Sequence, residues 1–398
     1  MRSTNAALVA SGEGLFVGSL ESLRGLAALM VAVGHSMLVL KISNIDMIWG
    51  RPIWTLETFD ARLVKSILFF ANGGAAVTIF FVLSGVVLGL SLDHAKLGGG
   101  RLYLAFLLRR LFRIFPAYLV ALPFVLLYLF AGISNPNGIP LATTFFNWSY
   151  RFFPSAPEIA ANLLLYDTTL IPVGWTLTTE IVVAAFFPLL YFISRRWPGY
   201  ATFLVLLVLL TPTFFPARAG AIILPHVYKF FVGLLIPVYG KAAYQFIFGS
   251  RNIGRLWFLL AMLPLLAERQ LVEVLHPGFG IIETAGAALI IFGLLQHSPH
   301  GGWKLLEWHP IRKLGQQSYS FYLWHFPLLF VIAWLMFKLV PFAWLEAHSL
   351  SASLLLCVTS VLITYRVSAL SYKFIEAPSI RVGKHLVARL LQPGRDGR

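Results

Sequence analysis

Apolar runs close to membrane-spanning length recur along almost the whole chain. The hydrocarbon core of a bilayer is about 30 Å thick, so a helix needs roughly 20 apolar residues to cross it. Only 12% of the 398 residues are charged, which is about half the roughly 25% that is usual in a soluble domain. So few charged side chains cannot cover a large surface in water. We therefore expect an all-α integral membrane protein, a bundle of about ten transmembrane helices.

The predicted spans form one domain, since no internal repeat marks a second one. Arg24 lies inside the first run, which also lacks a small-residue cleavage site, so this run is expected to be a retained span and not a signal peptide. We expect a cytoplasmic N-terminal segment at 1–17, the transmembrane domain at 18–375 and a basic cytoplasmic tail at 376–398. The ten spans are predicted at about 18–40, 66–92, 102–131, 176–194, 201–216, 222–239, 256–267, 279–297, 319–340 and 351–372.

The basic residues predict the orientation of this bundle. With the N-terminus inside, 20 of the 31 Lys and Arg residues fall in cytoplasmic segments and seven in external ones. Cytoplasmic loops of membrane proteins carry such an excess, so we expect both termini on the cytoplasmic side of a bacterial inner membrane. The longest loop, 132–175, is then external, with an interfacial helix expected near 157–170. The same bias explains the net charge of +15 without a nucleic-acid partner.

Two ionisable residues in the first run point to a polar face inside the bundle. Arg24 and His35 are eleven residues apart, so they differ by about 20° around the helix axis and about 16 Å along it. Small residues such as Gly25 and Gly34 let another helix or a slender substrate come close to this face. Charged groups at membrane depth are costly and often functional. The alternative is that Arg24 snorkels to the interface and His35 is a hydrogen-bonded core histidine.

Arginines gather at the predicted cytoplasmic entry of the third span. Arg109 and Arg113 are four residues apart, and Arg110 and Arg113 are three apart, so either pair can converge on one anion. Guanidinium groups bind phosphate oxygens well, which suits the phosphates of coenzyme A. Ordinary topogenic charge is the alternative.

Glu180 opens the run that follows the external loop, five residues after Trp175. Its predicted depth places it in the same outer half of the bundle as His35. A carboxylate beside an imidazole fixes the tautomer of the ring and stabilises its protonated form. Capping and interfacial anchoring are the alternative explanation.

Further polar residues are expected to line a cavity inside the bundle. Tyr322 and His325 share one face of the ninth span. Ser84 lies in a run rich in small residues, where close helix packing accounts for most of the composition. It lacks the Gly-x-Ser-x-Gly turn of a serine hydrolase. The cavity-lining candidates are Ser84, Trp175, Tyr322 and His325.

Six segments, in this order, resemble the membrane acyltransferase-3 family, bacterial enzymes that acylate polysaccharides, O-antigens, Nod factors and macrolides. They are LRGLAALMVAVGH (23–35), FFVLSG (80–85), RRLFRIFPAY (109–118), GWTLTTE (174–180), SYSFYLWH (318–325) and FIEAP (374–378). Together they run from the first span to the last. One departure is Thr176, since many members have Trp-Ser-Leu here. Many relatives also carry an esterase-like extension, and we expect its step to be absent or supplied by a partner.

The resemblance implies roles for particular residues. Arg24 and His35 look like the essential Arg/His pair of the family, and Glu180 matches its acid after the tryptophan. Arg110 and Arg113 match its cytoplasmic arginine motif, which is associated with the acyl donor. The donor-binding candidates are therefore Arg109, Arg110, Arg113 and Tyr118.

The implied function is that of an O-acyltransferase. It would move a short acyl group, with acetyl the expected one, from cytoplasmic acyl-CoA to a hydroxyl of a saccharide, glycolipid or other acceptor. His35 is the expected general base, with Glu180 orienting it and Arg24 stabilising negative charge or binding the donor. A covalent acyl-histidine stays open. Acyl-CoA is a co-substrate, and no permanently bound cofactor or metal is expected, because Cys357 is the single cysteine and no metal-ligand spacing occurs. The oligomeric state is not predicted.

The main alternative is a transporter or flippase for a lipid-linked glycan or another anion, because intramembrane charges and broken helices fit that class as well. The lack of an inverted repeat speaks against it. A scaffold without chemistry leaves Arg24 and His35 unexplained.

Overall fold

A computed structural model describes residues 3–93, 99–197, 199–215, 223–248, 261–263, 265–266, 278–296 and 305–391. This described part is helical, with two isolated bridges and no strand. Within it, six helical segments are long and apolar enough to cross a membrane. They are Phe59–Asp93, Gly100–Phe130, Pro172–Arg196, Gly278–Leu295, Ser318–Leu339 and Ser349–Arg389. The protein is thus an all-helical, multi-pass membrane protein.

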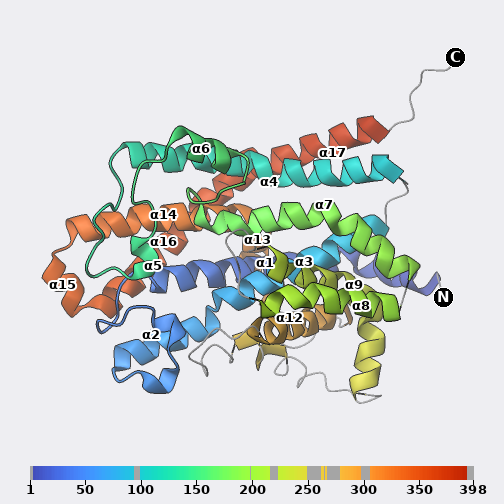
Figure 1. Cartoon of the computed structure of the whole chain (residues 1–398), viewed down its shortest axis with the longest axis horizontal. Coiled ribbons are helices and arrows are strands. Elements are labelled where there is room, and N and C mark those ends of the chain that lie inside the picture. Colours follow the sequence, from blue (N-terminus) through green and yellow to red (C-terminus); the bar gives the residue numbers. More distant parts are fainter. Residues whose placement is uncertain are drawn as a thin grey trace.

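The long helices run roughly side by side along the longest axis of the molecule (Figure 1). The α-helices are α1 (Ser3–Met37), α2 (Phe59–Phe70), α3 (Gly73–Asp93), α4 (Gly99–Phe130), α5 (Thr144–Asn147), α6 (Ala156–Leu163), α7 (Trp175–Arg196), α8 (Tyr200–Leu210), α9 (Leu224–Phe248), α12 (Gly278–Gln296), α13 (His309–Gln316), α14 (Ser318–Leu339), α15 (Phe342–Ala347), α16 (Ser349–Ser371) and α17 (Ala377–Leu391). Short turns of helix are η1 (Ile48–Gly50), η2 (Ile53–Thr55), η3 (Pro172–Gly174), η4 (Thr211–Phe214) and the π-helix η6 (Tyr372–Glu376).

Most predicted spans overlap these helices, although α1 begins at Ser3, before the predicted 18, and α9 ends at Phe248, beyond the predicted 239. Two other spans differ in an informative way. The predicted span 66–92 is two helices, because the chain breaks at Ala71 and Asn72. The side-chain oxygen of Asn72 accepts hydrogen bonds from the backbone N–H groups of Gly74 and Ala75, so it caps α3 at its start. The predicted span 201–216 is the 11-residue helix α8 followed by η4, which is shorter than a typical span.

Two further predictions concern the loops. In the predicted range 157–170 the structure has the helix α6, which begins with a capping box of Ser155 and Glu158 and ends at Leu163. Its place at the membrane interface stays a prediction. The predicted span 256–267 falls mostly outside the described residues, with only 261–263 and 265–266 inside them.

Close crossings of helices explain the small residues in the apolar runs. A Cβ atom on Gly25 of α1 would lie 2.6 Å from the backbone nitrogen of Gly315 in α13. On Gly85 of α3 it would lie 2.0 Å from the carbonyl oxygen of Phe230 in α9, and on Gly233 of α9 it would lie 2.1 Å from a backbone oxygen of α3. The backbones of these pairs therefore touch, which is the packing that small residues permit in membranes.

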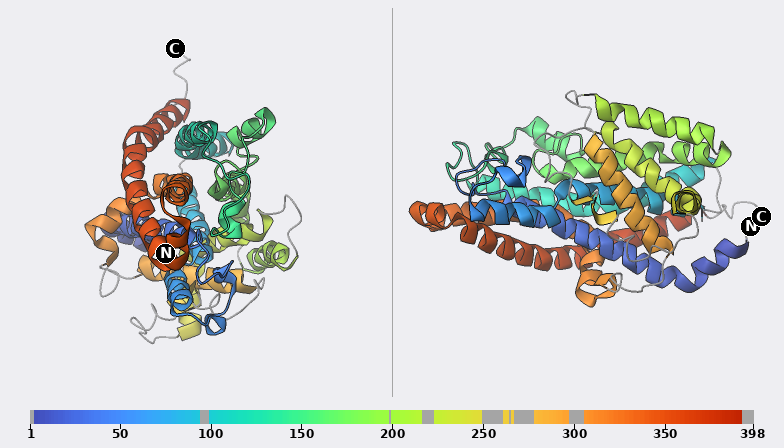
Figure 2. Two further views of the ribbon diagram at one scale, coloured as in Figure 1. Left: turned by 90° about the vertical axis from the view of Figure 1, so that its left-hand side faces the viewer. Right: turned by 90° about the horizontal axis from the view of Figure 1, so that it is seen from below.

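Both ends of the described chain lie at one end of the bundle. The start of α1 and the end of α17 are together there, while α2, α5 and α15 lie at the opposite end (Figures 1 and 2). The chain remains helical past the predicted boundary near 375. It continues from α16 through η6 into α17, which packs along α4. Arg24 and His35 thus lie at different depths along α1, with His35 toward the end that carries α2 and α5.

The segment between α4 and α7 folds back over the end of α1. The backbone N–H of Thr143 donates to the carbonyl of Val39 (2.9 Å), and its hydroxyl donates to the carbonyl of Leu38 (2.5 Å). Thr144 donates to the carboxylate of Asp46 through its backbone and its hydroxyl. Burial alone would raise the pKa of Asp46, but the hydrogen bonds, led by that from the Thr144 hydroxyl, lower it overall. These contacts hold α5 against the end of α1.

Candidate active site

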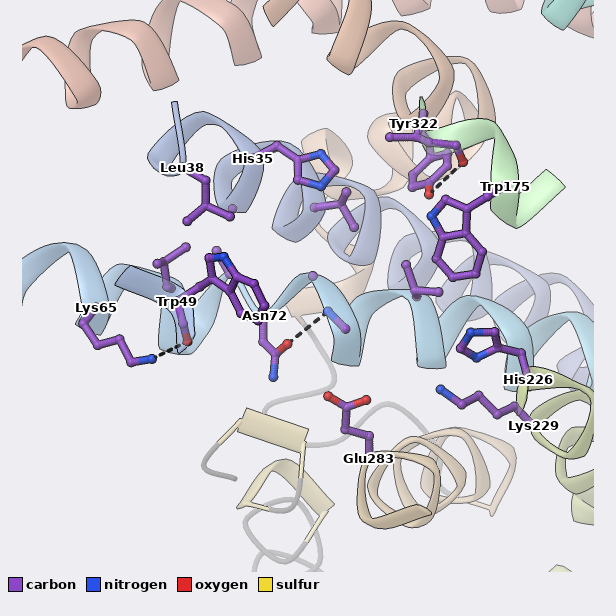
Figure 3. Close-up of a pocket in the computed structure, with 18 residues that line it drawn as sticks. His35, Leu38, Trp49, Lys65, Asn72, Trp175, His226, Lys229, Glu283 and Tyr322 are labelled. Carbon is purple, nitrogen blue, oxygen red and sulfur yellow. Dashed lines mark hydrogen bonds between the residues drawn. The ribbon is translucent and has the colours of Figure 1, made fainter. Parts of the chain in front are cut away.

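The first helix carries the two residues around which the site is built. Arg24 and His35 are both half-buried, and His35 lines a cavity of about 490 Å³. The ring of His35 is packed against Phe145 of α5 (centroids 5.3 Å apart) and Phe326 of α14 (5.5 Å). The fold therefore surrounds one side of the imidazole with aromatic side chains and leaves another side on the cavity (Figure 3).

His35 forms a hydrogen bond with a second histidine. Its Nδ1 lies 3.0 Å from Nε2 of His325 in α14, and the two rings stack with centroids 5.2 Å apart. Nδ1 of His325 lies 2.5 Å from the carbonyl oxygen of Tyr322, one turn earlier in the same helix. A chain of two hydrogen bonds thus connects the backbone of α14 to His35.

This chain fixes the tautomers of both rings when they are neutral. A carbonyl oxygen has no hydrogen, so His325 must donate from Nδ1 to Tyr322, and its Nε2 is left as an acceptor. His35 then donates from Nδ1 to His325, and its own Nε2 carries the free lone pair. Burial disfavours the charged form of an imidazole. The arrangement therefore provides a neutral base or nucleophile in the ring that lines the cavity.

Arginines and carboxylates form a second cluster around Arg24, which precedes His35 by eleven residues in α1. Arg110 of α4 donates a hydrogen bond to Glu180 of α7 within a largely buried ion pair. Arg24 interacts electrostatically with Arg110, Glu180, Arg113 and Glu376. We call these five residues the arginine cluster. It contains three cations and two anions, so it carries a net positive charge that suits an anionic ligand.

Glu376 joins this cluster from the π-helix after α16. It is buried, and its carboxylate accepts a hydrogen bond from Ser320 of α14 (2.7 Å). The hydroxyl of Tyr319, next to Ser320, donates to the carbonyl of Ile114 in α4 (2.6 Å). π-helical turns are frequent at functional sites, and here the turn places a carboxylate among the arginines.

The cavity beside His35 has a polar wall on the other side. Lys229 of α9 donates from Nζ to the hydroxyl of Thr78 in α3 (2.8 Å), and Thr78 donates to Oε2 of Glu283 in α12 (3.2 Å). Lys229 and Glu283 both line the cavity (Figure 3), together with Asn72 at the break between α2 and α3. Three helices thus each contribute one member of a buried relay, which we call the Lys229 relay.

The predicted contact between Glu180 and His35 is wrong. Within the described residues Glu180 bonds to Arg110, and the partner of His35 is His325. The reason is depth: α7 begins at Trp175, which does reach the cavity of His35. Glu180 lies five residues farther along, about 7.5 Å down the axis, and so reaches the arginine cluster instead.

The structure separates the predicted donor-binding residues. Arg110 is buried and interacts with Arg113, whereas Arg109 lies on an exposed face of α4, so only the pair three residues apart converges. The hydroxyl of Tyr118 donates to the carbonyl of Asn162 in α6 (2.8 Å), which ties the segment between α4 and α7 to α4. Arg101 is exposed near the start of α4.

Among the predicted cavity-lining residues, Trp175 and Tyr322 do line the cavity. His325 takes part through its bond to His35, and Ser84 is not among the residues that line it. Thr176, where the sequence departs from the family pattern, has its hydroxyl 3.0 Å from the carbonyl oxygen of Val173, to which it donates, and 3.1 Å from the hydroxyl of Tyr322. This hydroxyl therefore joins the start of α7 to α14.

Sequence reasoning missed the Lys229 relay. The signal was present, because Lys229 and Glu283 both lie within predicted spans, where ionisable residues are functional candidates. Their proximity to His35 was not visible, since α9 and α12 come near α1 only when the bundle is folded and both pack against α3.

The chain is a membrane bundle with paired histidines and clustered arginines in its interior. These features place it in the class of multi-pass membrane enzymes. Within that class, the acyltransferase-3 profile, described as an acyltransferase domain, matches residues 17–368. The match covers most of the chain, so the protein belongs to this family and is an acyltransferase that transfers groups other than aminoacyl groups. The resemblance read from the sequence motifs is confirmed.

Two of the bacterial proteins to which it is similar align with most of its length. It is 27% identical to the exopolysaccharide production protein ExoZ of Rhizobium meliloti over 282 residues, which are 66% of this chain and 79% of ExoZ. It is 24% identical to the peptidoglycan O-acetyltransferase OatA of Listeria monocytogenes over 345 residues, which are 77% of this chain and 51% of OatA. The chain thus spans about half the length of OatA. No solved structure matches it.

The ion pair in the arginine cluster generates a prediction about stability. Replacing Glu180 by alanine leaves Arg110 buried without its carboxylate, and breaking a buried pair costs about 3–5 kcal/mol. Asp93→Ala is the matched control, because its pair with Arg195 is about one-third exposed and exposed pairs contribute about 0–1 kcal/mol. We expect the melting temperature in detergent to fall much further for Glu180→Ala. Equal shifts for the two variants would contradict this account.

Proposed function

We propose that the protein is an O-acyltransferase of the bacterial inner membrane that transfers a short acyl group, with acetyl the expected one, from cytoplasmic acyl-CoA to a hydroxyl of a saccharide or glycoconjugate. The observation that carries the proposal is the hydrogen-bond chain from the Tyr322 carbonyl through His325 to His35. It leaves a basic nitrogen in a ring that lines a cavity inside a membrane acyltransferase. The names of ExoZ and OatA support a polysaccharide acceptor and an acetyl group.

The arginine cluster supports binding of the acyl donor. Arg24, Arg110 and Arg113 interact with one another across α1 and α4. Phosphate oxygens of coenzyme A are suitable ligands for such guanidinium groups. Arg24 and His35 are separated by about 16 Å along α1, a distance that the extended pantetheine arm can span. The thioester would then reach His35 while the phosphates stay at the cytoplasmic end.

The transfer step follows from the tautomer of His35. Nε2 takes the proton of an acceptor hydroxyl as the hydroxyl oxygen bonds to the thioester carbonyl carbon. The carbon–sulfur bond then breaks, and the proton on Nε2 passes to the departing thiolate, so that ester and free coenzyme A are formed. His325 accepts from Nδ1 of His35 throughout and holds the ring in position. A route in which Nε2 itself carries the acyl group first needs the same tautomer.

The orientation is part of the proposal. We place both termini and the arginine cluster on the cytoplasmic side, in a bundle of ten spans. The support is the bias of 20 to seven in basic residues, together with the common end at which α1 begins and α17 ends (Figure 1). The cavity of His35 then lies nearer the external face.

The first test concerns the base. We expect His35→Ala to lower kcat for transfer of label from radioactive acetyl-CoA by about 10²–10⁴-fold, because a positioned general base contributes that much. His348→Ala is the control, since this histidine is exposed at the start of α16. Size-exclusion chromatography in detergent checks that both variants fold. Full activity in a folded His35→Ala protein would reject the scheme.

The second test concerns the positioning residue His325. Leucine at this position removes the acceptor for Nδ1 of His35, whereas the side-chain oxygen of glutamine can accept that hydrogen bond. We expect His325→Leu to lower kcat by about 10–100-fold with little change in KM for acetyl-CoA. His325→Gln should recover a large part of the loss. If glutamine and leucine are equally damaging, the hydrogen bond is not what matters.

The third test concerns topology. Reporter fusions after Tyr150, in the segment between α4 and α7, and at the C-terminus should report opposite sides of the membrane. A periplasmic signal is expected at Tyr150 and a cytoplasmic one at the C-terminus. Signals from the same side at both positions would reject the ten-span layout.

A further inference from the structure

We infer that the indole N–H of Trp175 is the hydrogen-bond donor that stabilises the negative charge formed on the thioester carbonyl oxygen during acyl transfer. The inference rests on the proposed function and adds a catalytic residue to it. Trp175 lines the same cavity as His35, and its N–H group is not used by the described part of the protein itself.

Acyl transfer to a hydroxyl needs a donor of this kind. When the hydroxyl oxygen bonds to the thioester carbon, the carbonyl oxygen takes up a negative charge, and hydrogen-bond donors aimed at that oxygen lower the barrier. His35 is fully occupied, because its Nε2 accepts the hydroxyl proton and its Nδ1 donates to His325. Arg24 lies about 16 Å away along α1, in the arginine cluster. The donor therefore has to come from another part of the cavity wall.

Several side-chain donors on the cavity wall already have an acceptor within the protein. These donors and their acceptors are Lys65 with the carbonyl of Trp49 (2.8 Å), Lys229 with the hydroxyl of Thr78 (2.8 Å), Asn72 with the carbonyl of Leu265 (3.0 Å) and Tyr322 with the carbonyl of Val173 (3.4 Å). The indole N–H groups of Trp49 and Trp175 differ, because neither donates to an acceptor within the described residues. An indole N–H can only donate, so an oxygen of a bound ligand is a suitable partner for it.

Hydrogen bonds connect Trp175 to the histidine pair. The next residue, Thr176, has its hydroxyl 3.1 Å from the hydroxyl of Tyr322, and the carbonyl of Tyr322 accepts from His325. Figure 3 shows Trp175 beside Tyr322, on the side of the cavity toward which the ring of His35 is directed. A thioester carbonyl between His35 and Trp175 therefore has the base on one side and the donor on the other.

Trp49 stands apart from this chain of hydrogen bonds. It belongs to the short helix η1, and its carbonyl accepts from Lys65 of α2. Figure 3 shows it near Lys65, on the opposite side of the cavity from Trp175. Of the two indole N–H groups, that of Trp175 is therefore the one placed to meet the reacting carbonyl.

The ring of Trp175 is held by side chains from two other helices. Its centroid lies 5.2 Å from that of His226 in α9 and 6.0 Å from that of Phe81 in α3. These contacts fix the indole without using its N–H group. A donor that is already in place does not have to be reoriented as charge develops, which makes it more effective.

The proton of the indole stays on its nitrogen throughout the transfer. The hydroxyl oxygen bonds to the carbonyl carbon, the hydroxyl proton passes to Nε2 of His35, and the carbonyl oxygen becomes an oxyanion that accepts from Trp175. The electron pair of the oxyanion then re-forms the carbonyl as the carbon–sulfur bond breaks. The proton on Nε2 passes to the thiolate sulfur, so ester and free coenzyme A are formed and both residues are restored.

The test removes the N–H group and keeps the ring. At position 175, β-(3-benzothienyl)alanine introduced by stop-codon suppression has sulfur in place of the indole N–H and nearly the same shape. The assay measures loss of label from radioactive acetyl-CoA, with the methyl glycosides of glucose and N-acetylglucosamine as acceptor probes. We expect this replacement and Trp175→Phe to lower kcat by about 10²–10³-fold. The KM of acetyl-CoA should change by less than about threefold.

Trp49→Phe is the matched comparison, since it removes the other indole N–H of the same cavity. It should lower kcat far less than Trp175→Phe does. Full kcat with the benzothienyl side chain at position 175 would overturn the inference, and so would an equal loss for Trp49→Phe. A wild-type protein that turns over no acetyl-CoA would instead reject the proposed function.

A second measurement does not depend on turnover. An acetyl-CoA analogue with a methylene group in place of the thioester sulfur cannot transfer its acetyl group, and an isotope label on the carbonyl carbon identifies its infrared band. A hydrogen bond to the carbonyl lowers the wavenumber of this band. We expect a lower wavenumber in the wild-type protein and in Trp49→Phe than in the protein with the benzothienyl side chain at position 175. The same wavenumber in all three would contradict donation by Trp175.

Discussion

Polar groups inside a bilayer find no water, so each one must be paired within the protein or by a ligand. Three such pairings organise this bundle. His35 is joined to His325, Arg110 is joined to Glu180, and Lys229 reaches Glu283 through one threonine. Each pairing connects helices that are far apart in the sequence. The helices around α1 are therefore held in register by the same groups that make up the candidate site.

The first helix carries two functional positions, eleven residues apart. At Arg24 the arginine cluster provides positive charge for phosphates, and at His35 a neutral imidazole lines a cavity with donors, acceptors and aromatic rings. Such a division suits the proposed reaction, in which a donor with phosphate groups and an acceptor hydroxyl meet at His35. The close crossing at Gly25 and Gly315 allows α13 to pack directly on α1 next to Arg24.

The sequence predicted much of the fold, and the errors have definite causes. Hydropathy identified α4, α7, α12, α14 and α16 to within a few residues, because helices in lipid must be apolar over a fixed length. It could not show that Asn72 interrupts the second run, since one amide in an apolar run costs little hydropathy yet caps a helix. The sequence also predicted that Glu180 lies near His35. Glu180 is five residues beyond Trp175 in α7, and the helical rise over these residues brings it to the arginines instead.

What the sequence alone determined is the membrane class, the family and the shared face of Arg24 and His35, because these depend on composition, motif order and helical periodicity. Tertiary structure decided the partners. It chose His325 and not Glu180 for His35, selected Arg110 over Arg109 for the buried cluster, and brought Lys229 and Glu283 to the cavity. Periodicity fixes which side of a helix a residue occupies, but only the packing of other helices fixes what it meets there.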